Sequence, residues 1–201
     1  MIVKGISIFF LLTAVFPFLT QAQEATPQLL KEPANWSFER FTLPPVFAPG
    51  FPYKGAEELR FSPGMFNKDS TDYFTYCFVA QLDNTATISQ DDVRNYLLEY
   101  FKGLCSSTAG ERKLSIDPSK ITVAIEKKKN TASNENIYNA VLHIFGVFAD
   151  GAPVKLNMEI EVLKNAAAKK IYLIFIASPQ EKTNEIWKQL YVIREDFAMP
   201  A

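Results

Sequence analysis

The sequence predicts an α+β domain, in which an antiparallel sheet of about six to seven strands is covered by two helices. Short segments of alternating or continuous apolar residues indicate strands, and two segments with apolar residues at helical spacing indicate helices. Short turns between successive strands favour antiparallel pairing, and the two helices must cover the apolar faces of the sheet. The predicted order is β-β-β-α-β-β-β-β-α. Of the 201 residues, 48% are hydrophobic and 21% charged, as is typical of globular domains.

The first 22 residues are predicted to be a secretory signal peptide that is removed from the mature protein. Lys4 precedes an apolar run from Ile6 to Phe16, and the small residue Ala22 stands where a signal peptidase would cut. The run is shorter than the roughly 20 residues of a transmembrane helix. Residues 23–34 are expected to be a flexible leader and residues 35–201 a single domain. We therefore expect a periplasmic or secreted protein with no membrane span after cleavage.

A proline-rich segment opens the domain. Six of the twelve prolines lie between Pro33 and Pro63. Two Pro-Gly pairs, Pro49-Gly50 and Pro63-Gly64, predict type II turns, because proline presets φ and glycine accepts a positive φ at the next position. Two short strands, Phe38 to Leu43 and Ala56 to Phe61, fit around these turns.

A central strand and a long helix follow. The strand from Tyr73 to Leu82 is apolar on both faces, which favours a position between two covering layers. The helix has Ser89 as its predicted N-cap and Asp92 three residues later, a capping pattern. Its apolar stripe comprises Val93, Leu97, Tyr100, Phe101 and Leu104. Gly103 and residues 106–110 are expected to end it.

The second half predicts a meander of strands and a closing helix. The strands are expected at Ile121 to Glu126, Tyr138 to Ala149, Val154 to Val162 and Ile171 to Ala177. Asp150-Gly151 favours a tight hairpin turn. The third of these strands alternates cleanly, which predicts a solvated outer face formed by Lys155, Asn157, Glu159 and Glu161. The helix begins near Asn184, with a stripe formed by Ile186, Leu190, Ile193 and Phe197 and with Trp187 beside it.

The layout of this second half is similar to that of a known family. A last strand ending in Ser178-Pro179 leads into a helix that begins Glu185-Ile186-Trp187 and runs to Phe197. Over residues 89–198 the layout resembles the PsbP-like fold, the family of the extrinsic photosystem II protein and its bacterial relatives. The resemblance implies a domain that docks onto other proteins. The segment from Leu43 to Phe66 is separately similar to secreted bacterial proteins of unknown function.

Charge and reactive residues exclude several classes of function. The net charge is −1, and a near-neutral surface does not favour nucleic acid or anionic lipid. His143, the only histidine, lies within a predicted strand and no nucleophile elbow is present, so a packed or partly exposed residue is favoured over a catalytic base. One histidine and two cysteines are too few for a zinc site, and no phosphate-binding loop is present. We expect no metal and no cofactor.

The two cysteines leave two alternatives. Cys77 lies on the central strand and Cys105 near the end of the helix that must pack back onto the sheet, so an exported protein could join them in a disulfide. The other alternative is two buried free thiols that behave as small hydrophobic groups.

No group of carboxylates converges convincingly. Glu159 and Glu161 are expected on a solvated face, and Glu58 and Arg60 as an exposed ion pair. The stretch from Asn67 to Asp72 resembles a calcium loop only superficially, because it lacks the glycine and the glutamate such a loop needs. We interpret it as a turn that leads into the next strand.

Aromatic residues in the proline-rich segment are the strongest functional signal. The candidate ligand-binding residues are Trp36, Phe47, Phe51, Tyr53 and Phe66. Aromatic side chains on stiff loops suit recognition, although the same residues would also fill one end of a core. The sequence therefore favours an exported, non-catalytic module that binds a protein, glycan or small ligand of the cell envelope through this segment. The alternative is a small hydrolase-like enzyme using carboxylates or His143 in a cleft between sheet and helix.

Overall fold

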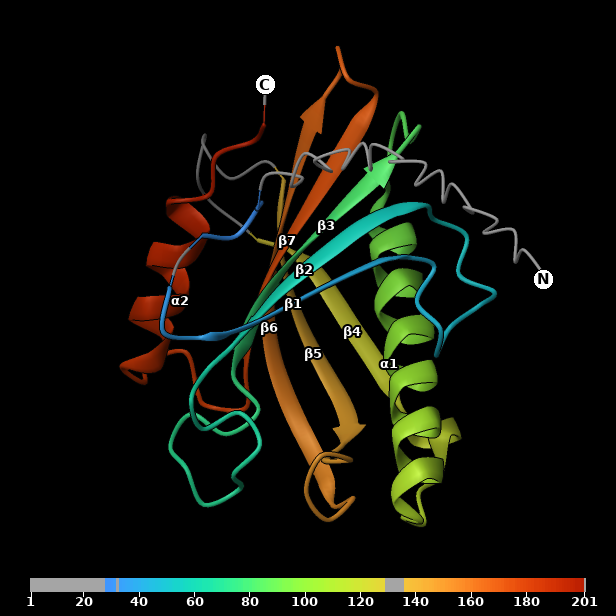
Figure 1. Ribbon diagram of the computed structural model, residues 1–201, viewed down its shortest axis with the longest axis vertical. Coiled ribbons are helices and arrows are strands. Elements are labelled where there is room, and N and C mark those ends of the chain that lie inside the picture. The colour runs from blue at the N-terminus through green and yellow to red at the C-terminus, as the bar shows by residue number, and fades with distance from the viewer. Residues whose placement is uncertain (1–27, 32, 129–135, 201) are drawn as a thin grey trace, which may run out of the picture.

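The computed structural model describes residues 28–31, 33–128 and 136–200. A seven-stranded antiparallel sheet, in the order β1-β2-β3-β7-β6-β5-β4, lies between helix α1 on one face and helix α2 on the other (Figure 1). The strands are β1 Ser37–Leu43, β2 Gly55–Phe61, β3 Tyr76–Asp83, β4 Thr122–Lys127, β5 Ile137–Phe145, β6 Pro153–Asn165 and β7 Lys170–Ser178. The helices are α1 Gln90–Arg112, the short 3-10 helix η1 Pro118–Lys120 and α2 Ile186–Glu195. The predicted fold class and element order are confirmed, whereas the predicted signal peptide lies outside the described residues.

Two meanders make up the sheet and meet where β3 pairs with β7. The strands β1 to β3 form the first meander and β4 to β7 the second. Tyr76 stands opposite Ala177 at one end of the joint, and Asp83 stands opposite Lys170 at the other. Helix α1 carries the chain from β3 to the far edge of the sheet. Within the described residues, neither α1 nor α2 combines the length and apolar character needed to cross a bilayer.

The sheet has a hydrophobic core on each face. On β3, Tyr76 and Phe78 belong to the core beneath α1, whereas Cys77 and Val79 belong to the core beneath α2. Every residue of β7 from Ile171 to Ser178 is buried, because the strand is covered on both sides. The sequence predicts that these two strands are covered on both faces, and this is confirmed for β3 and β7.

Helix α1 begins as predicted but is longer. The backbone N–H of Asp92 donates to the Ser89 hydroxyl over 3.2 Å, and the Ser89 N–H donates to the Asp92 carboxylate over 2.8 Å, which completes the predicted capping box. The prediction that Gly103 and residues 106–110 end the helix is wrong. Buried Cys105 and Ala109 continue the apolar stripe, and the helix runs to Arg112, after which Lys113 caps it in a left-handed conformation.

Both Pro-Gly turns are present, although neither is of type II. Phe51 N–H donates to Ala48 and Met65 N–H to Ser62, each over 3.0 Å. Neither Gly50 nor Gly64 has the positive φ that a type II turn requires. Gly64 is needed for space instead, since a Cβ there would collide with the side chains of Ser70 and Asp72.

Two predicted boundaries in the meanders are wrong. The central strand begins at Tyr76 rather than Tyr73, because Phe74 has a left-handed φ of 49° that interrupts the extended backbone. The connection between β5 and β6 occupies residues 146–152 rather than the two residues of a tight hairpin. Gly151, at a φ of 76°, donates its N–H to the carbonyl of Gly146 over 3.0 Å and closes this longer loop.

The two cysteines are free, and a disulfide between them is not formed. Cys77 lies in the core beneath α2, and Cys105 lies on α1 in the core beneath that helix, so the sheet separates the two thiols. Strand alternation is the physical reason, because Cys77 points to the face opposite α1. The alternative of two buried free thiols is the one observed.

The expected exposed ion pair between Glu58 and Arg60 is also wrong. Both side chains are buried, and they bind the chain segment before β1 rather than each other. The Glu58 carboxylate accepts from the N–H groups of Leu29 and Leu30 over 2.6 and 2.9 Å, and Arg60 donates to the carbonyl oxygens of Leu30 and Trp36. Part of the stretch expected to be a flexible leader is therefore anchored on the sheet.

Candidate functional site

The five aromatic residues singled out from the sequence do not form one surface. Trp36 is buried in the core beneath α2, whereas Phe47, Phe51 and Tyr53 pack on the opposite face beside α1. Phe51 and Tyr53 contact the ring of Tyr96, with centroids 4.6 and 5.9 Å apart. The core-filling alternative therefore applies to Trp36 and Phe51, both buried.

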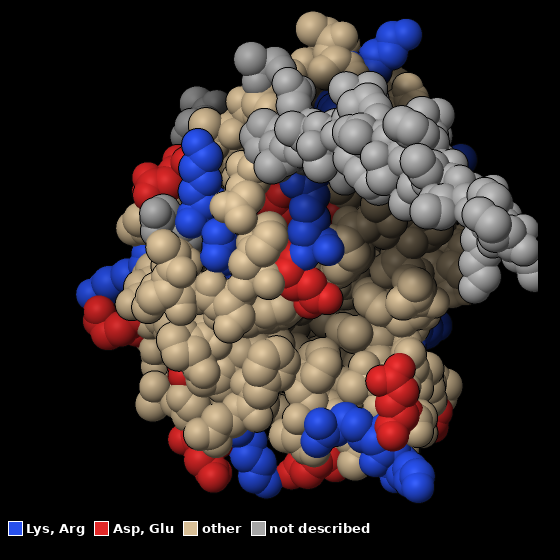
Figure 2. Space-filling model, in the orientation of Figure 1, with Lys and Arg blue, Asp and Glu red and all other residues tan. Residues whose placement is uncertain are grey.

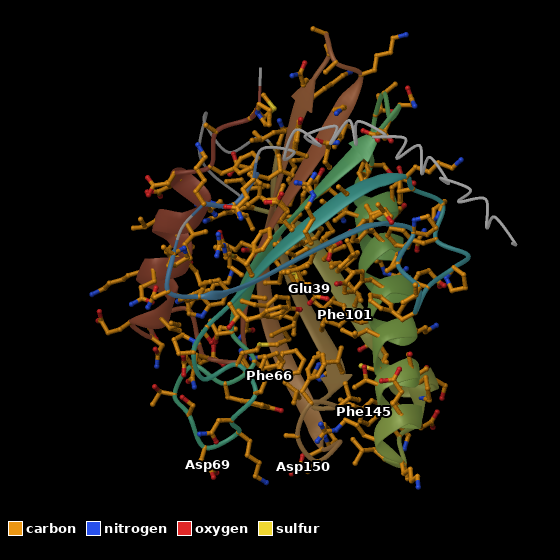
Figure 3. The ribbon with its side chains drawn as sticks, in the orientation of Figure 1. Glu39, Phe66, Asp69, Phe101, Phe145 and Asp150 are labelled. Carbon is orange, nitrogen blue, oxygen red and sulfur yellow. The ribbon has the colours of Figure 1, made fainter. Side chains whose placement is uncertain are left out.

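Phe47 lines a hollow between α1 and the first three strands, and Phe66 lies beside its rim. The volume of the hollow is about 200 Å³. We call it the aromatic hollow, and its lining residues are Glu39, Phe41, Phe47, Leu59, Phe61, Met65, Phe74, Tyr76, Tyr100, Leu104 and Phe148. Phe66 is 53% exposed and contacts the rings of Phe61 and Phe148 at 5.7 and 5.5 Å. Figure 2 shows the recess in a largely uncharged surface beside α1, and Figure 3 labels Glu39 and Phe66 on either side of this region.

Strand register and helix spacing build the aromatic hollow. Glu39 on β1 stands opposite Leu59 on β2, and Phe61 stands opposite Tyr76 on β3, so these side chains point to the face that α1 covers. Tyr100 and Leu104 follow at helical spacing and form the wall. The turn that carries Phe47 lies close to α1 because Gly103 has no side chain: a Cβ there would collide with the Phe47 carbonyl oxygen.

A buried carboxyl lies directly behind the aromatic hollow. The hydroxyls of Tyr96 and Tyr100 both donate to Glu57, each over 2.7 Å. Burial raises the pKa of Glu57 to about 7, the two hydroxyls partly offset this rise, and the negative charge of Glu39 adds to it. Burial also raises the pKa of both tyrosines well above the usual value, and Glu57 adds to that effect. A polar triad thus borders a recess whose lining is mainly apolar and includes one charged residue, Glu39.

The spacing of residues in the sequence contains a signal for this triad. Glu57 alternates with Leu59 and Phe61, so strand periodicity places a carboxyl on an apolar face. Tyr96 and Tyr100 are four residues apart on the helix, which puts both hydroxyls on one side. A carboxyl on an apolar strand face needs donors, and such a tyrosine pair supplies them.

A second hollow of about 420 Å³ lies on the other side of the molecule, between α2 and the segment before β1. It is more open than the aromatic hollow, and half of its lining residues are polar or charged. The lining residues are Pro33, Asn35, Trp36, Lys188, Gln189, Val192, Ile193 and Asp196. Because this second hollow is more open and its charged residues have both signs, the aromatic hollow is the better candidate site.

The prediction of a solvated outer face on β6 is wrong for Glu159 and Asn157, because α2 and the segment before it cover them. Glu159 binds Arg194 at 2.6 Å, Lys182 at 2.8 Å and Lys128 at 3.1 Å, and accepts from the Tyr191 hydroxyl at 3.2 Å. Burial raises the pKa of Glu159, but the hydrogen bonds and charges of Lys182 and Lys128 outweigh that effect and leave the pKa below its usual value. This Glu159 cluster fastens α2 to the sheet.

His143 and the acidic loop do not join the candidate site. His143 is exposed on β5 between Thr122 and Lys155, and it lines neither hollow. The loop carrying Asp69 lies at the lower end of the molecule (Figure 3). Asp72 in this loop accepts from the Gly64 N–H over 2.9 Å and from the Ser70 hydroxyl, as a turn requires. Among residues 28–31, 33–128 and 136–200, no three side chains of the metal-binding types gather to hold an ion.

Comparisons of the chain with family models, with curated proteins and with solved structures find no match. The resemblance to PsbP-like proteins therefore stays a prediction from the sequence.

Proposed function

We propose that this protein is an exported, non-catalytic binding module whose ligand places a small apolar group in the aromatic hollow. The aromatic hollow itself is the observation that carries this proposal. Eleven side chains from β1, β2, β3, α1 and three loops converge on it, and only Glu39 among them is charged. Concave, mainly apolar recesses with a few polar groups are the usual form of a small-molecule site.

The size of the aromatic hollow limits the group that it accepts. A dry cavity of about 150 Å³ holds benzene, so a volume near 200 Å³ suits one ring with a short substituent. A larger ligand, including a protein or glycan of the cell envelope, would insert only one such group and rest its remainder on the rim beside Phe66. Export is supported by the signal-peptide pattern of residues 1–22.

The proposal is tested by adding toluene to the protein and following methyl resonances by NMR. Met65 is 1% exposed and lines the aromatic hollow, so its methyl signal reports occupancy. We expect saturable shifts of the Met65 and Leu59 methyl signals. Replacing Leu104 with phenylalanine fills the space and is expected to weaken binding about tenfold or more, because the added ring competes with the ligand for the same volume.

Leu98→Phe is the matched control. Leu98 lies on the same helix and packs against the same core, but it does not line the aromatic hollow. This variant should bind toluene as the unmodified protein does. The proposal fails if toluene leaves the Met65 methyl signal unmoved in the unmodified protein, a result that does not depend on how well either variant folds.

A further inference from the structure

The charge of the aromatic hollow has one sign. Among the described residues, Glu39 is the single charged one that lines it, and no described lysine or arginine does so. Within the described part of the chain, no side chain donates a hydrogen bond to the Glu39 carboxylate or forms an ion pair with it. Its neighbour Arg40 points to the opposite face of the sheet, where it binds Glu58 at 2.8 Å. An anionic group therefore stands at the mouth, and no cation of the described residues lies opposite it.

The rings add to this negative field. Phe41 meets Phe47 edge to face with centroids 6.2 Å apart, and Phe47 meets Tyr100 in the same way at 5.0 Å. The faces of such rings are negative, and a cation within about 6 Å of a ring centroid is attracted to them. Glu39 stands on β1 two residues before Phe41, on the same face of the strand.

A second carboxyl lies deeper in the same direction. Glu57 lies behind Tyr100 and accepts a hydrogen bond from the Tyr100 hydroxyl. Glu57 is also close enough to Glu39 for the negative charge of Glu39 to disfavour ionisation of Glu57. A cation at the mouth would relieve this repulsion. No cation of the described chain lines the aromatic hollow to do so.

We propose that the ligand of the aromatic hollow is an organic ammonium ion with a small apolar body. The ammonium group binds the Glu39 carboxylate and the adjacent ring faces, while the apolar body lies among Leu59, Met65 and Leu104. This assignment rests on the proposed function, because it names the chemical class of the ligand for the same site. Neutral ligands lack the charge attraction to Glu39 and to the ring faces, and anionic ligands are repelled by Glu39.

Three probes of nearly equal shape test the assignment. Benzylamine is a cation at neutral pH, benzyl alcohol is neutral, and benzoate is an anion. Each is titrated into the protein while the Met65 methyl signal is followed by NMR. We expect benzylamine to bind about fivefold more tightly than benzyl alcohol, because its ammonium group gains an exposed cation–π contact and the attraction of the Glu39 carboxylate. Benzoate should bind most weakly of the three.

The variant Glu39→Gln should bring the affinities for benzylamine and benzyl alcohol to within about twofold, without weakening the binding of the alcohol. Glu126→Gln is the matched control, because Glu126 is exposed on β4 at the far edge of the sheet and loses the same charge. It should leave the preference for benzylamine unchanged.

The outcomes separate the two proposals. Equal affinities of the unmodified protein for benzylamine and benzyl alcohol would overturn the ammonium assignment while leaving the binding site in place. The assignment also fails if Glu126→Gln removes the preference as fully as Glu39→Gln does, because the preference would then reflect net charge alone. If none of the three probes, nor toluene, moves the Met65 methyl signal, the proposed function itself is wrong.

Discussion

Glu57 is a carboxyl group enclosed on the apolar face of the sheet, where two tyrosine hydroxyls are its hydrogen-bond partners. Burial favours the protonated form of Glu57 and raises its pKa from 4.5 to about 7. The folded protein therefore holds this proton more tightly than the unfolded chain does. Stability from this group is therefore fully present below pH 4.5 and is lost as the pH rises to about 7.

The first prediction concerns the pH dependence of stability. We expect the free energy of unfolding to fall by about 3 kcal/mol between pH 4.5 and pH 8 through Glu57 alone. Glu57→Gln keeps an acceptor for the tyrosine hydroxyls but cannot ionise, so it should lack this contribution. Urea unfolding of both proteins at several pH values measures the difference. Parallel pH profiles of the two proteins would show that Glu57 titrates normally.

At the scale of the element, the glycines of α1 have opposite roles. Gly103 lies against the backbone of Phe47, whereas nothing lies within 4 Å of a Cβ placed on Gly110. Alanine at an open helical position stabilises a helix by about 1 kcal/mol relative to glycine. At Gly103 the same methyl group would push the turn that carries Phe47 away from the helix, and crowding of this kind costs about 1–3 kcal/mol.

Two alanine variants test this difference. We expect Gly110→Ala to raise the free energy of unfolding and Gly103→Ala to lower it, as measured by urea denaturation. Helix propensity acts equally on both variants, so opposite signs isolate the contact with Phe47. Gly103→Ala should also weaken toluene binding, because Phe47 lines the aromatic hollow. A stabilising effect of both substitutions would contradict the close approach.

Helix α2 shows how tertiary contacts support a short element. It has ten residues and no side-chain hydrogen bond at its N-cap, and isolated helices of this length are marginal in water. Trp187, Leu190 and Ile193 bury its apolar face against β3 and β7. Arg194 and Tyr191 bind Glu159, which fastens the polar side of the helix to β6. The charges of the Glu159 cluster are thus explained by docking of the helix.

At the scale of the whole molecule, the sheet divides the interior into two cores, with one thiol in each. Cys77 and Cys105 are both almost fully buried, and burial raises the pKa of Cys77 to about 12. Thiolates are the reactive form, so both cysteines should resist modification in the folded protein.

The last prediction follows from this separation. Under native, non-reducing conditions, we expect neither thiol to react appreciably with an alkylating reagent within minutes. After denaturation without reductant, two thiols should be labelled, as counted by mass spectrometry. In the variant Cys77→Ala, one labelled thiol should be counted under the same denaturing conditions, that of Cys105. Failure to label either cysteine in the denatured, unreduced protein would show a disulfide and contradict the placement of the cysteines on opposite faces.

The sequence alone determined the order of the elements and most of their positions, because helices and strands depend on local periodicity and on short-range caps. The Ser89 capping box, the alternation along β6 and the apolar run of β7 are all readable from neighbouring residues. For the candidate site, the sequence indicated Phe47 and Phe66, but it did not separate them from Trp36, which lies on the other face.

Tertiary structure alone decided which charged residues are buried and what binds them. Glu58, Glu159 and Arg60 occupy strand positions that alternation assigns to an outer face, and that face is solvated only where nothing covers it. The covering segments, residues 28–31 and α2, come from opposite ends of the described chain, so no local pattern reveals them. The aromatic hollow has the same origin, because its walls come from segments between residues 39 and 148 that meet only when the sheet and α1 pack together.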